Sequence, residues 1–297
     1  MRPAFIINGT ITGFERIIES IQQQFSDTEI TIIPTRYAGH AGELASQFAA
    51  ESFSHIISVG GDGTLHQVIN GILASTKKFD GIVSVLPYGT GNDFARAKGF
   101  QKSVEHLKHK LLTKQFEYCD SGFIKFHDGE QEQTKYFVNI ADTGLGAAVV
   151  QDMMHSGNNF GKKVQYTISV LKTFFKYKKQ LIEIQTDDFV YKNKTMLAIV
   201  ANSNFFGSGY HIAPMASTNN GALELIIIGD ISIKDYLLNL PRLRKGLQIM
   251  HPQVHYHTFK TPITIKCANT IFTEADGELI TSGTLQLGVI EKAFKLL

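Results

Sequence analysis

Hydrophobic and polar positions follow two different patterns along this chain. Over the first 100 residues, short continuous apolar runs alternate with stretches whose apolar residues recur every three or four positions. Continuous apolar runs are typical of strands buried on both faces, and the longer spacing is typical of amphipathic helices. The predicted strands are 4–8, 29–35, 55–61 and 81–87, and the predicted helices between them are 13–25, 39–52 and 65–75. This βαβα order predicts a doubly wound parallel sheet.

After about residue 116 the pattern changes to short apolar segments separated by polar or glycine-rich turns. Only two good helical patterns interrupt them, near 161–178 and 232–248. This arrangement is typical of an antiparallel β-sandwich. We therefore expect an α/β domain over 1–118, rejoined by the tail 288–297, and a β-sandwich domain over 119–287. A cleft between two such domains is a natural place for a ligand.

Composition narrows the class of protein without identifying it. The chain has 297 residues, 43% of them hydrophobic and 19% charged, which is typical of a globular protein. Its formal net charge of +2 gives no reason to expect a nucleic-acid partner. Cys119 and Cys267 form no C-x-x-C pair, which favours a reducing cytoplasm. No apolar run approaches the roughly 20 residues of a membrane span, so we expect a cytoplasmic protein that can dock transiently on the inner membrane face.

The segment "GGDGT" at 60–64 lies between a predicted strand and a predicted helix. Thr64 and Gln67 fit a capping box, which predicts a helix beginning near Thr64. A helix N-terminus behind a glycine turn can bind an anion. Asp62 would repel a phosphate unless a metal ion or a proton lay between them, so it suits a Mg²⁺-linked carboxylate or a base. A tight turn with an aspartate cap is an equally good interpretation of this loop alone.

A second loop of the same kind strengthens the functional interpretation. "LPYGTGNDFARAKG" at 86–99 also follows a predicted buried strand, and Asn92 or Asp93 can cap the helix after it. Two such loops at the carboxyl ends of neighbouring strands converge where open α/β sheets bind their ligands.

Other familiar motifs are absent. "GNNFGKK" at 157–163 is one residue short of a P-loop and lacks its hydroxyl, so a loop that opens a helix is the better interpretation. The chain contains neither the dinucleotide fingerprint nor the protein kinase and hydrolase signatures. His251, His255 and His257 lack a nearby cysteine or acidic partner, which favours surface or strand positions over a metal site.

Taken together, "GGDGTLHQVINGI" and "LPYGTGNDFAR" resemble the diacylglycerol kinase catalytic domain in its soluble bacterial form. These lipid kinases are related to sphingosine and ceramide kinases and, more distantly, to NAD kinases. The resemblance continues through 137–149, 201–228 and 272–279. It implies a two-domain kinase of NAD kinase-like fold, with ATP bound in the interdomain cleft and a lipid hydroxyl as the phosphoryl acceptor.

The resemblance also implies roles for individual residues. Glu278, in "DGE" at 276–278, matches the family's proton acceptor, and Asp62 and Asp93 would join it in catalysis. We favour Glu278 as the base, with Asp62 organising metal and water. The first loop reads "NGTITG" where the family usually has Asn-Pro, so its match is weaker. The positions that match nucleotide contacts are Asn8, Thr12, Thr35, Gly60, Gly61, Gly63, Thr64, Leu65, His66, Gln67, Thr90 and Asn92.

Several departures from the family bear on this prediction. His66-Gln67 stands where the family often has Asn-Glu, and Asn219-Asn220-Gly221 stands where it has an Asp-Asp-Gly site for a structural Mg²⁺. Neutral amides are poorer ligands for a hard cation than carboxylates. If a metal binds there, the matching positions are Ser217, Asn220 and Ala222. Without the resemblance, "EADGEL" would be read as a hairpin turn.

The sequence therefore predicts an ATP- and Mg²⁺-dependent kinase that phosphorylates diacylglycerol or a related lipid at a membrane surface. We place its lipid pocket near Phe205, Phe206, Tyr210 and Ile212. A spare strand edge could also pair two copies into a homodimer. Two alternatives remain open: a kinase of NAD kinase type that acts on a soluble substrate, and a nucleotide-binding sensor that has lost catalysis.

Overall fold

A computed structural model of the protein describes residues 1–113, 115–155, 162–207 and 209–297. The chain divides into two compact units, one formed by residues 1–120 together with 291–297 and the other by residues 121–290. The sequence analysis places the corresponding boundaries at 118 and 287. None of the described helices is both long and apolar enough to cross a membrane. The segment "GNNFGKK" lies largely outside the described residues.

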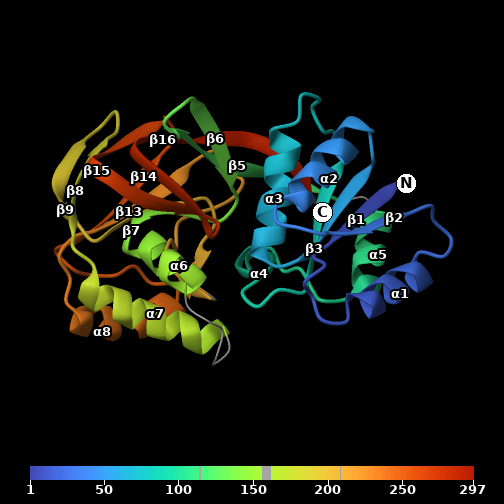
Figure 1. The fold of residues 1–297 in the computed structure, drawn as a ribbon, viewed down its shortest axis with the longest axis horizontal. Coiled ribbons are helices and arrows are strands. Elements are labelled where there is room, and N and C mark those ends of the chain that lie inside the picture. Colours follow the sequence, from blue (N-terminus) through green and yellow to red (C-terminus); the bar gives the residue numbers. More distant parts are fainter. Residues whose placement is uncertain (114, 156–161, 208) are drawn as a thin grey trace. The chain divides into compact units, whose positions relative to one another are not determined.

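The first unit is built on a parallel sheet (Figure 1). Its strands are β1 (Pro3–Ile7), β2 (Thr31–Pro34), β3 (His55–Gly60) and β4 (Ile82–Pro87). They lie in the order β4-β3-β1-β2, and every neighbouring pair is parallel. The end of β16 (Glu278–Leu296) joins β4 in parallel through Lys295 and Leu296. The predicted doubly wound sheet is confirmed, and the tail of the chain belongs to it.

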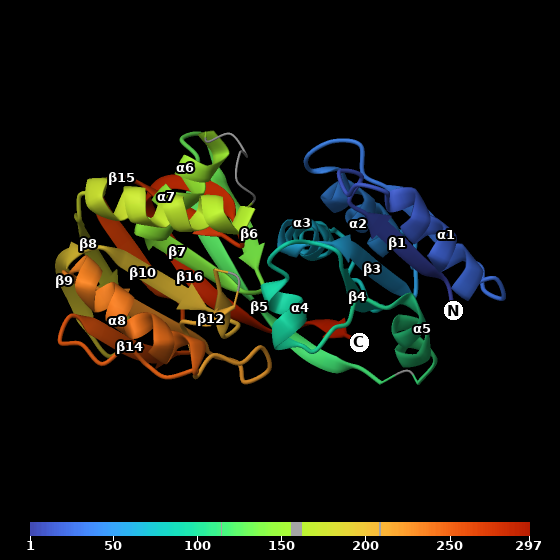
Figure 2. The ribbon, with the colours of Figure 1, turned by 90° about the horizontal axis from the view of Figure 1, so that it is seen from below.

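Helices cover the sheet of the first unit on both faces (Figure 2). They are α1 (Phe14–Gln24), α2 (His40–Ala50), α3 (Asp62–Leu73), α4 (Asp93–Ala97) and α5 (Val104–Thr113). Phe5 and Ile7 form one core cluster with Ile21 of α1 and Leu107 of α5. Because side chains alternate along a strand, Ala4 and Ile6 point to the opposite face, against which α2 and α3 pack.

The second unit is an antiparallel sandwich. A strip of strands runs in the order β14-β13-β10-β7-β15-β16, with the pair β8 and β9 attached to β15 and the pair β5 and β6 attached to β16. A separate short pair is formed by β11 (Phe205–Phe206) and β12 (Tyr210–His211). The other bounds are β5 (Glu117–His127), β6 (Glu132–Phe137), β7 (Ile140–Gly144), β8 (Gln180–Gln185), β9 (Val190–Thr195), β10 (Leu197–Ala201), β13 (Leu223–Ile228), β14 (Val254–Phe259) and β15 (Ile263–Ala275).

Both faces of this strip are buried. Leu225 and Ile227 of β13 belong to the core inside the sandwich, whereas Ile226 and Ile228 belong to a second core on the opposite face. The second core is covered by α7 (Lys162–Lys176) and α8 (Ile233–Arg244), which lie side by side across it (Figures 1 and 2). Burial on both faces explains why β13 reads as a continuous apolar run.

The structure corrects the predicted number of helices in this unit. Besides α7 and α8, it contains α6 (Leu145–His155), which the sequence analysis missed. Helix α6 follows β7 directly, after Gly144 with a φ of 116°. Its first turn is tied down by a side chain from the preceding strand, since Asp142 Oδ1 accepts the Ala147 N–H at 2.8 Å. A helix begun in this way carries no cap signal of the usual spacing, unlike α8, where Ser232 and Asp235 form a full capping box.

Candidate functional site

Four loops of the first unit gather at one edge of its sheet. Asn8, Thr35, Gly61 and Tyr88 each follow the carboxyl end of a strand, and the four strands are parallel. Backbone hydrogen bonds tie the loops together, with the Asn8 N–H donating to the Val59 carbonyl at 2.9 Å and the Tyr88 N–H donating to the Gly60 carbonyl at 2.8 Å. The structure therefore assembles the predicted crevice loops within a single unit.

Three of the residues matched to nucleotide contacts meet at this edge. The Thr35 hydroxyl accepts the Gly9 N–H at 3.1 Å, and the Asn8 side-chain amide donates to the Thr64 hydroxyl at 3.3 Å. A Cβ at Gly9 would come within 2.1 Å of the Thr35 carbonyl oxygen, so the first loop can lie here only with a glycine. The "NGTITG" loop thus has a packing reason for its glycine although it lacks the family's proline.

The two glycine loops touch each other backbone to backbone. A Cβ at Gly89 would lie 2.3 Å from the Gly61 Cα, so neither loop tolerates a side chain at this contact. Gly63 is different, because a Cβ there would meet nothing within 4 Å. The backbone at the start of α3 is therefore open to a ligand, and a helix N-terminus favours an anion.

Asp62 joins the two loops. Its carboxylate accepts the backbone N–H groups of Asp93 at 3.1 Å and Phe94 at 3.2 Å, which are the first two of α4. The aspartate thus caps a helix, as one interpretation of its loop proposed, but the helix belongs to the neighbouring loop and not to its own. Each carboxylate oxygen accepts one of these bonds.

The side-chain caps predicted for helices α3 and α4 do not form. Helix α3 begins at Asp62 with Gly61 as the N-cap residue, so Thr64 lies inside the helix and no capping box with Gln67 forms. Asn92 does occupy the N-cap position of α4, but its side chain makes no capping bond. Its amide instead exchanges hydrogen bonds with the Gly89 backbone at 3.1 and 2.8 Å. The local spacing predicted that each loop caps the helix that follows it. In the structure, the N-terminus of α4 is instead capped by Asp62, which belongs to the other glycine loop.

The remaining matched residues of the first unit differ in accessibility. Asp93 is buried and pairs with Arg96 at 2.6 Å, and Arg96 also donates to the Gly91 carbonyl. Leu65 and His66 turn into the interior, where they are 1% and 4% exposed. Thr12 and Thr90 are exposed in their turns, and Gln67 is half-buried on α3. The structure therefore brings Asn8, Thr35, Thr64, Asp62 and Asp93 to the sheet edge and places Leu65 and His66 behind it.

The second unit holds the "DGE" turn. Asp276 and Gly277, with φ values of 49° and 93°, connect β15 to β16, and Glu278 is the first residue of β16. The predicted hairpin is confirmed. The Asp276 carboxylate accepts three backbone N–H groups, from residues 138, 139 and 140, at 2.8–3.1 Å. Glu278 is exposed, so its carboxylate is accessible to a substrate.

Comparison with known proteins matches both halves of this arrangement. The diacylglycerol kinase catalytic domain matches residues 3–124, and the YegS C-terminal NAD kinase beta sandwich-like domain matches residues 139–297, which is more than half of the chain. The chain belongs to the diacylglycerol kinase family of lipid kinases. The predicted resemblance is confirmed.

Individual relatives agree with this assignment. A diacylglycerol kinase of Bacillus subtilis is 25% identical over 283 residues, covering 94% of this chain and 90% of the relative. The crystal structure of a diacylglycerol kinase from Bacillus anthracis superposes with a TM-score of 0.71 at 16% identity, covering 99% of this chain and 96% of that one. Yeast NADH kinase shares the fold more distantly, with a TM-score of 0.55 at 11% identity over all of this chain and 82% of that one.

The loop that corresponds to the family's structural Mg²⁺ site does not fit a cation in this lipid kinase. The Ser217 hydroxyl donates to the Asn219 side-chain oxygen at 2.8 Å, and the Asn220 side-chain oxygen accepts the Ala222 N–H at 3.0 Å. The loop thus closes on itself through neutral groups. Over residues 1–113, 115–155, 162–207 and 209–297, no group of three or more His, Cys, Asp or Glu side chains is placed to hold a metal ion.

The three histidines singled out from the sequence have other surroundings. His255 and His257 both belong to β14. The His257 ring stacks on Phe189, just before β9, and the His255 ring lies beside Tyr191 of β9. His251 lies 3.8 Å from Asp235. The strand and surface positions expected for these residues agree with what the structure describes.

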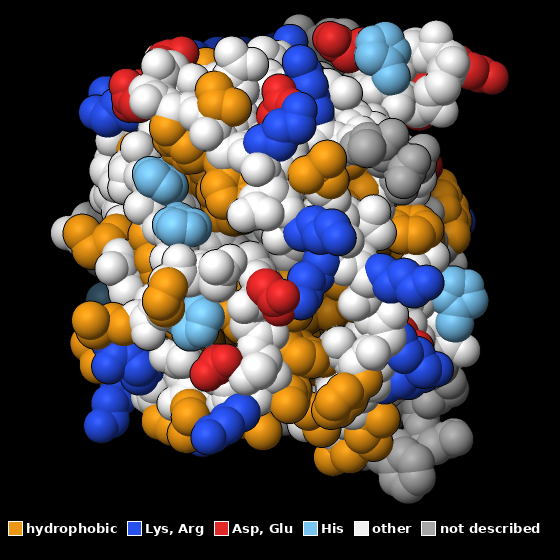
Figure 3. Space-filling model, turned by 90° about the vertical axis from the view of Figure 1, so that its left-hand side faces the viewer, with side chains coloured by type: hydrophobic (Ala, Val, Ile, Leu, Met, Phe, Trp, Pro, Cys, Tyr) orange, Lys and Arg blue, Asp and Glu red, His pale blue; other side chains and the backbone are white. Residues whose placement is uncertain are grey.

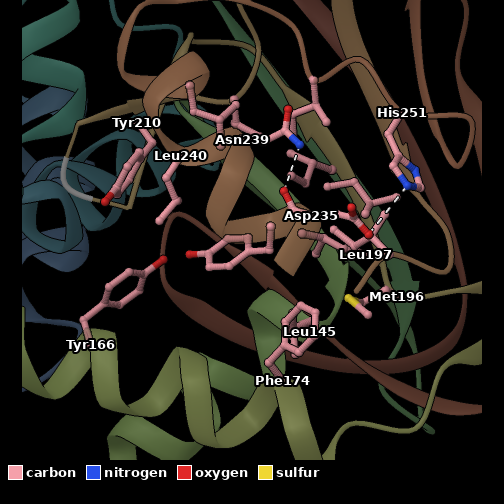
Figure 4. Close-up of a pocket in the computed structure, with 17 residues that line it drawn as sticks. Leu145, Tyr166, Phe174, Met196, Leu197, Tyr210, Asp235, Asn239, Leu240 and His251 are labelled. Atoms are coloured by element: carbon pink, nitrogen blue, oxygen red, sulfur yellow. Dashed lines mark hydrogen bonds and ion pairs between the residues drawn. The ribbon is translucent and has the colours of Figure 1, made fainter. Parts of the chain in front are cut away.

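An apolar pocket beneath α7 and α8 was located only in part from the sequence (Figure 4). Its cavity volume is about 80 Å³, which is smaller than the roughly 300–1,000 Å³ of a usual ligand pocket. Of the four residues around which the sequence analysis placed a lipid pocket, Tyr210 and Ile212 line this one and Phe205 packs on His211, whereas the Phe206 side chain lies outside what the structure describes. In Figure 4, Tyr166 and Tyr210 lie at one side, and Asp235 and His251 lie at the other. The apolar lining is Leu145, Phe174, Met196, Leu197, Ile199, Ile212, Ile228, Ile231, Leu240, Leu243 and Ile249.

Proposed function

We propose that this protein transfers the γ-phosphoryl group of ATP to the hydroxyl of a lipid, with diacylglycerol as the first candidate. The observation that carries a lipid acceptor is the apolar pocket beneath α7 and α8. A soluble, highly charged acceptor such as NAD would gain nothing from a pocket lined mainly by Leu, Ile, Met and Phe, whereas an acyl chain would. The pocket belongs to the same unit as Glu278.

The loops of the first unit suit the nucleotide. The open backbone at Gly63 and the N-terminus of α3 would bind phosphate oxygens, with Asn8, Thr35 and Thr64 alongside. Asp62 would hold the second glycine loop in place through α4, next to the metal that accompanies the nucleotide. Mg²⁺ bound with the nucleotide neutralises charge on the phosphates during transfer.

Glu278 would act as the general base toward the acceptor hydroxyl. It is exposed at the first position of β16, and the backbone before it is fixed by Asp276. A base must be accessible to the proton that it removes, and it must be held in place for transfer. Asp93 is a poorer choice because it is buried and paired with Arg96.

The surface of α7 suits contact with a membrane. Val164, Ile168, Leu171 and Phe175 form a stripe of exposed apolar side chains, and Phe175 is 73% exposed. Exposed apolar groups of this size mark interaction sites in soluble proteins. Lys172, which pairs with Asp152, and Lys176 lie beside the stripe in the sequence. On the face of the molecule drawn in Figure 3, Lys and Arg side chains lie among apolar ones. Such a surface favours a membrane that contains anionic lipid.

A panel assay with γ-labelled ATP tests this function. Diacylglycerol, a sphingoid base, a ceramide and a monoacylglycerol are presented in mixed micelles, and NAD is presented in solution. We expect label in at least one lipid and none in NAD. Label in NAD alone would establish the soluble-substrate alternative, and tight ATP binding without transfer to any acceptor would establish the sensor.

The acyl pocket can be tested separately by filling it. Leu240→Trp replaces an aliphatic lining side chain by a larger aromatic one that fills part of the pocket. We expect the KM for the lipid to rise about tenfold or more, which corresponds to a loss of ~1.4 kcal/mol or more of binding free energy. The KM for ATP should stay within twofold. Leu112→Trp is the matched control, because Leu112 is exposed on α5 of the first unit. Equal lipid KM values for the two variants would contradict the proposed pocket.

A further inference from the structure

Two carboxyl groups lie against each other inside the second unit. Asp142 on β7 and Glu274 on β15 are direct partners across the antiparallel pair, and they are 1% and 2% exposed. Beside them, the hydroxyls of Thr143 and Thr273 are 2.9 Å apart. Among the contacts of the described residues, neither carboxyl group pairs with a lysine, arginine or histidine. Two buried acids without a cation can coexist only if a proton replaces one of the charges.

The surroundings favour such a shared proton. Burial raises the pKa of Glu274 well above its usual range, and the neighbouring Asp142 raises it further. Burial also raises the pKa of Asp142 to about 6, although hydrogen bonds from Glu274 and the Ala147 backbone oppose the shift. The other titratable groups that face the pair are Tyr177 and Asp276, neither of which supplies a positive charge.

The pair is attached to two functional segments. The Glu274 carboxyl accepts the Gly277 N–H inside the "DGE" turn. Asp142 Oδ1 accepts the Ala147 N–H at the start of α6, and Leu145 of the same turn lines the apolar pocket. A Cβ at Gly146 would lie 2.1 Å from Asp142 Oδ2, so the chain passes as close to this carboxyl as a glycine allows. The pair therefore lies between the base and the acyl pocket of the proposed function.

The turn that carries Glu278 is thus held by two different carboxyl groups. Asp276 fixes it to the backbone of residues 138–140, and Glu274 fixes Gly277 from the other side. Gly277 is the residue directly before Glu278, and its φ of 93° lies in the left-handed region. A displacement of the Glu274 carboxyl group therefore displaces the Gly277 N–H, and through Gly277 the backbone of Glu278.

We propose that Asp142 and Glu274 are positioning residues for the kinase reaction, sharing one proton and thereby fixing the turn that presents Glu278. This inference rests on the proposed function, in which Glu278 accepts the proton of the acceptor hydroxyl. When the shared proton is lost to solvent at high pH, two like charges face each other in a buried site and repel. The Glu274 carboxylate is then driven from its position, and the Gly277 N–H with it.

Glu274→Gln and Glu274→Leu separate this role from simple packing. The glutamine keeps an oxygen for the Gly277 N–H and an N–H for Asp142, so it mimics the shared proton permanently. The leucine removes the acceptor for Gly277. We measure kcat and KM for ATP and lipid from pH 6 to 9.5 in the parent, both variants and Glu278→Gln, with thermal unfolding of each followed by circular dichroism.

We expect the kcat of Glu274→Gln to match that of the parent near pH 6.5 and to exceed it about fivefold or more at the alkaline end, since the parent alone can lose the proton. In Glu274→Leu, kcat should fall about tenfold or more at every pH while the KM for ATP stays within twofold. A constant ratio of kcat between Glu274→Gln and parent across the pH range would overturn the proposal, and this ratio decides the matter even where Glu274→Leu fails to fold.

The failure of this inference can be distinguished from failure of the proposed function. Full activity of Glu278→Gln would refute Glu278 as the base and, with it, any role for the pair in positioning that base. An inactive Glu278→Gln together with a constant Glu274→Gln ratio would leave the base in place and refute only the shared-proton pair.

Discussion

The two aspartate-glycine turns of this protein look alike in sequence and serve different backbones. Asp62 stands at the start of a helix and accepts two N–H groups from the neighbouring loop, 31 and 32 residues away. Asp276 stands in a hairpin with positive φ and accepts three N–H groups, 136 to 138 residues away. In both turns the aspartate carboxylate fixes backbone that is distant in the sequence.

The difference between the turns lies in the acidic residue beside them. In the first unit that residue is Asp93, which is buried and paired with Arg96. In the second unit it is Glu278, which is exposed. Both turns thus contain an aspartate that holds the backbone, but only the second presents a free carboxylate. The comparison teaches that the aspartate of such a motif can be structural even where the motif itself is functional.

The largest effect that the comparison predicts comes from the contact between the glycine loops. In Gly89→Ala, the new Cβ would clash with the Gly61 Cα, so the first-unit loops must separate. We expect kcat/KM for ATP to fall about a hundredfold or more, because displacement by an ångström can cost that much. Steady-state kinetics measure it, with Gly283→Ala as the control, since a Cβ at Gly283 would meet only the Cys267 carbonyl at 4.0 Å. Equal kinetics of the two variants would show that the loops need not touch.

A smaller effect separates the two aspartates. Asp62→Asn and Asp276→Asn each replace one acceptor oxygen by an N–H group that faces a backbone donor. Both should therefore lose about 1–3 kcal/mol of unfolding free energy. Only Asp62→Asn should also raise the KM for ATP, by about tenfold, because α4 and its loop lose their anchor. Denaturant unfolding and kinetics check this together, and a raised KM for ATP in Asp276→Asn alone would reverse the assignment.

Gly63→Ala should separate stability from binding. The position is helical and a Cβ meets nothing within 4 Å, so alanine should stabilise α3 by about 0.5–1 kcal/mol. If phosphate approaches this backbone, the methyl group should nevertheless raise the KM for ATP about fivefold or more, a loss of roughly 1 kcal/mol. Denaturant unfolding gives the unfolding free energy, and steady-state kinetics on the same preparation give the KM for ATP. An unchanged KM for ATP would show that the nucleotide does not approach Gly63.

The smallest effect concerns the pH dependence of stability. Because the folded pKa values of Asp142 and Glu274 are raised, their contribution to stability is complete below about pH 4. The Asp142 part is lost as the pH rises through about 6, and the Glu274 part is lost as the pH rises through the raised pKa of that group. Glu274→Gln removes one of these titrations. Its unfolding free energy relative to the parent should therefore increase between pH 5 and 8, by on the order of 1 kcal/mol. A difference that is independent of pH would indicate that the pair does not titrate in the folded protein.

Much of this architecture could be predicted because its signals are local. Apolar runs identified the parallel strands, and the Asp276-Gly277 pair identified the hairpin. The caps could not be predicted, because Asp62 bonds to a helix 31 residues later and spacing rules consider only one turn. Helix α6 was missed for the same reason, since its first turn is held by Asp142 from a strand.

The buried acid pair was also beyond the reach of sequence patterns. Asp142 and Glu274 are separated by more than 130 residues, and only the register of β7 against β15 brings them together. The structure alone shows that they form a buried pair. Predicting it would require the strand register, which the hydrophobic alternation of each strand alone does not supply.

The most direct test of the central claim compares Glu278→Gln with Asp276→Asn at a temperature well below unfolding. If the aspartate holds the turn and the glutamate reacts, Glu278→Gln should lower kcat about 10²- to 10⁴-fold with an unchanged unfolding temperature. Asp276→Asn should lower the unfolding temperature and reduce kcat less than about tenfold. Glu291→Gln, exposed on the same strand, controls for loss of an acidic group. Full activity of Glu278→Gln toward the lipid acceptor would contradict the account.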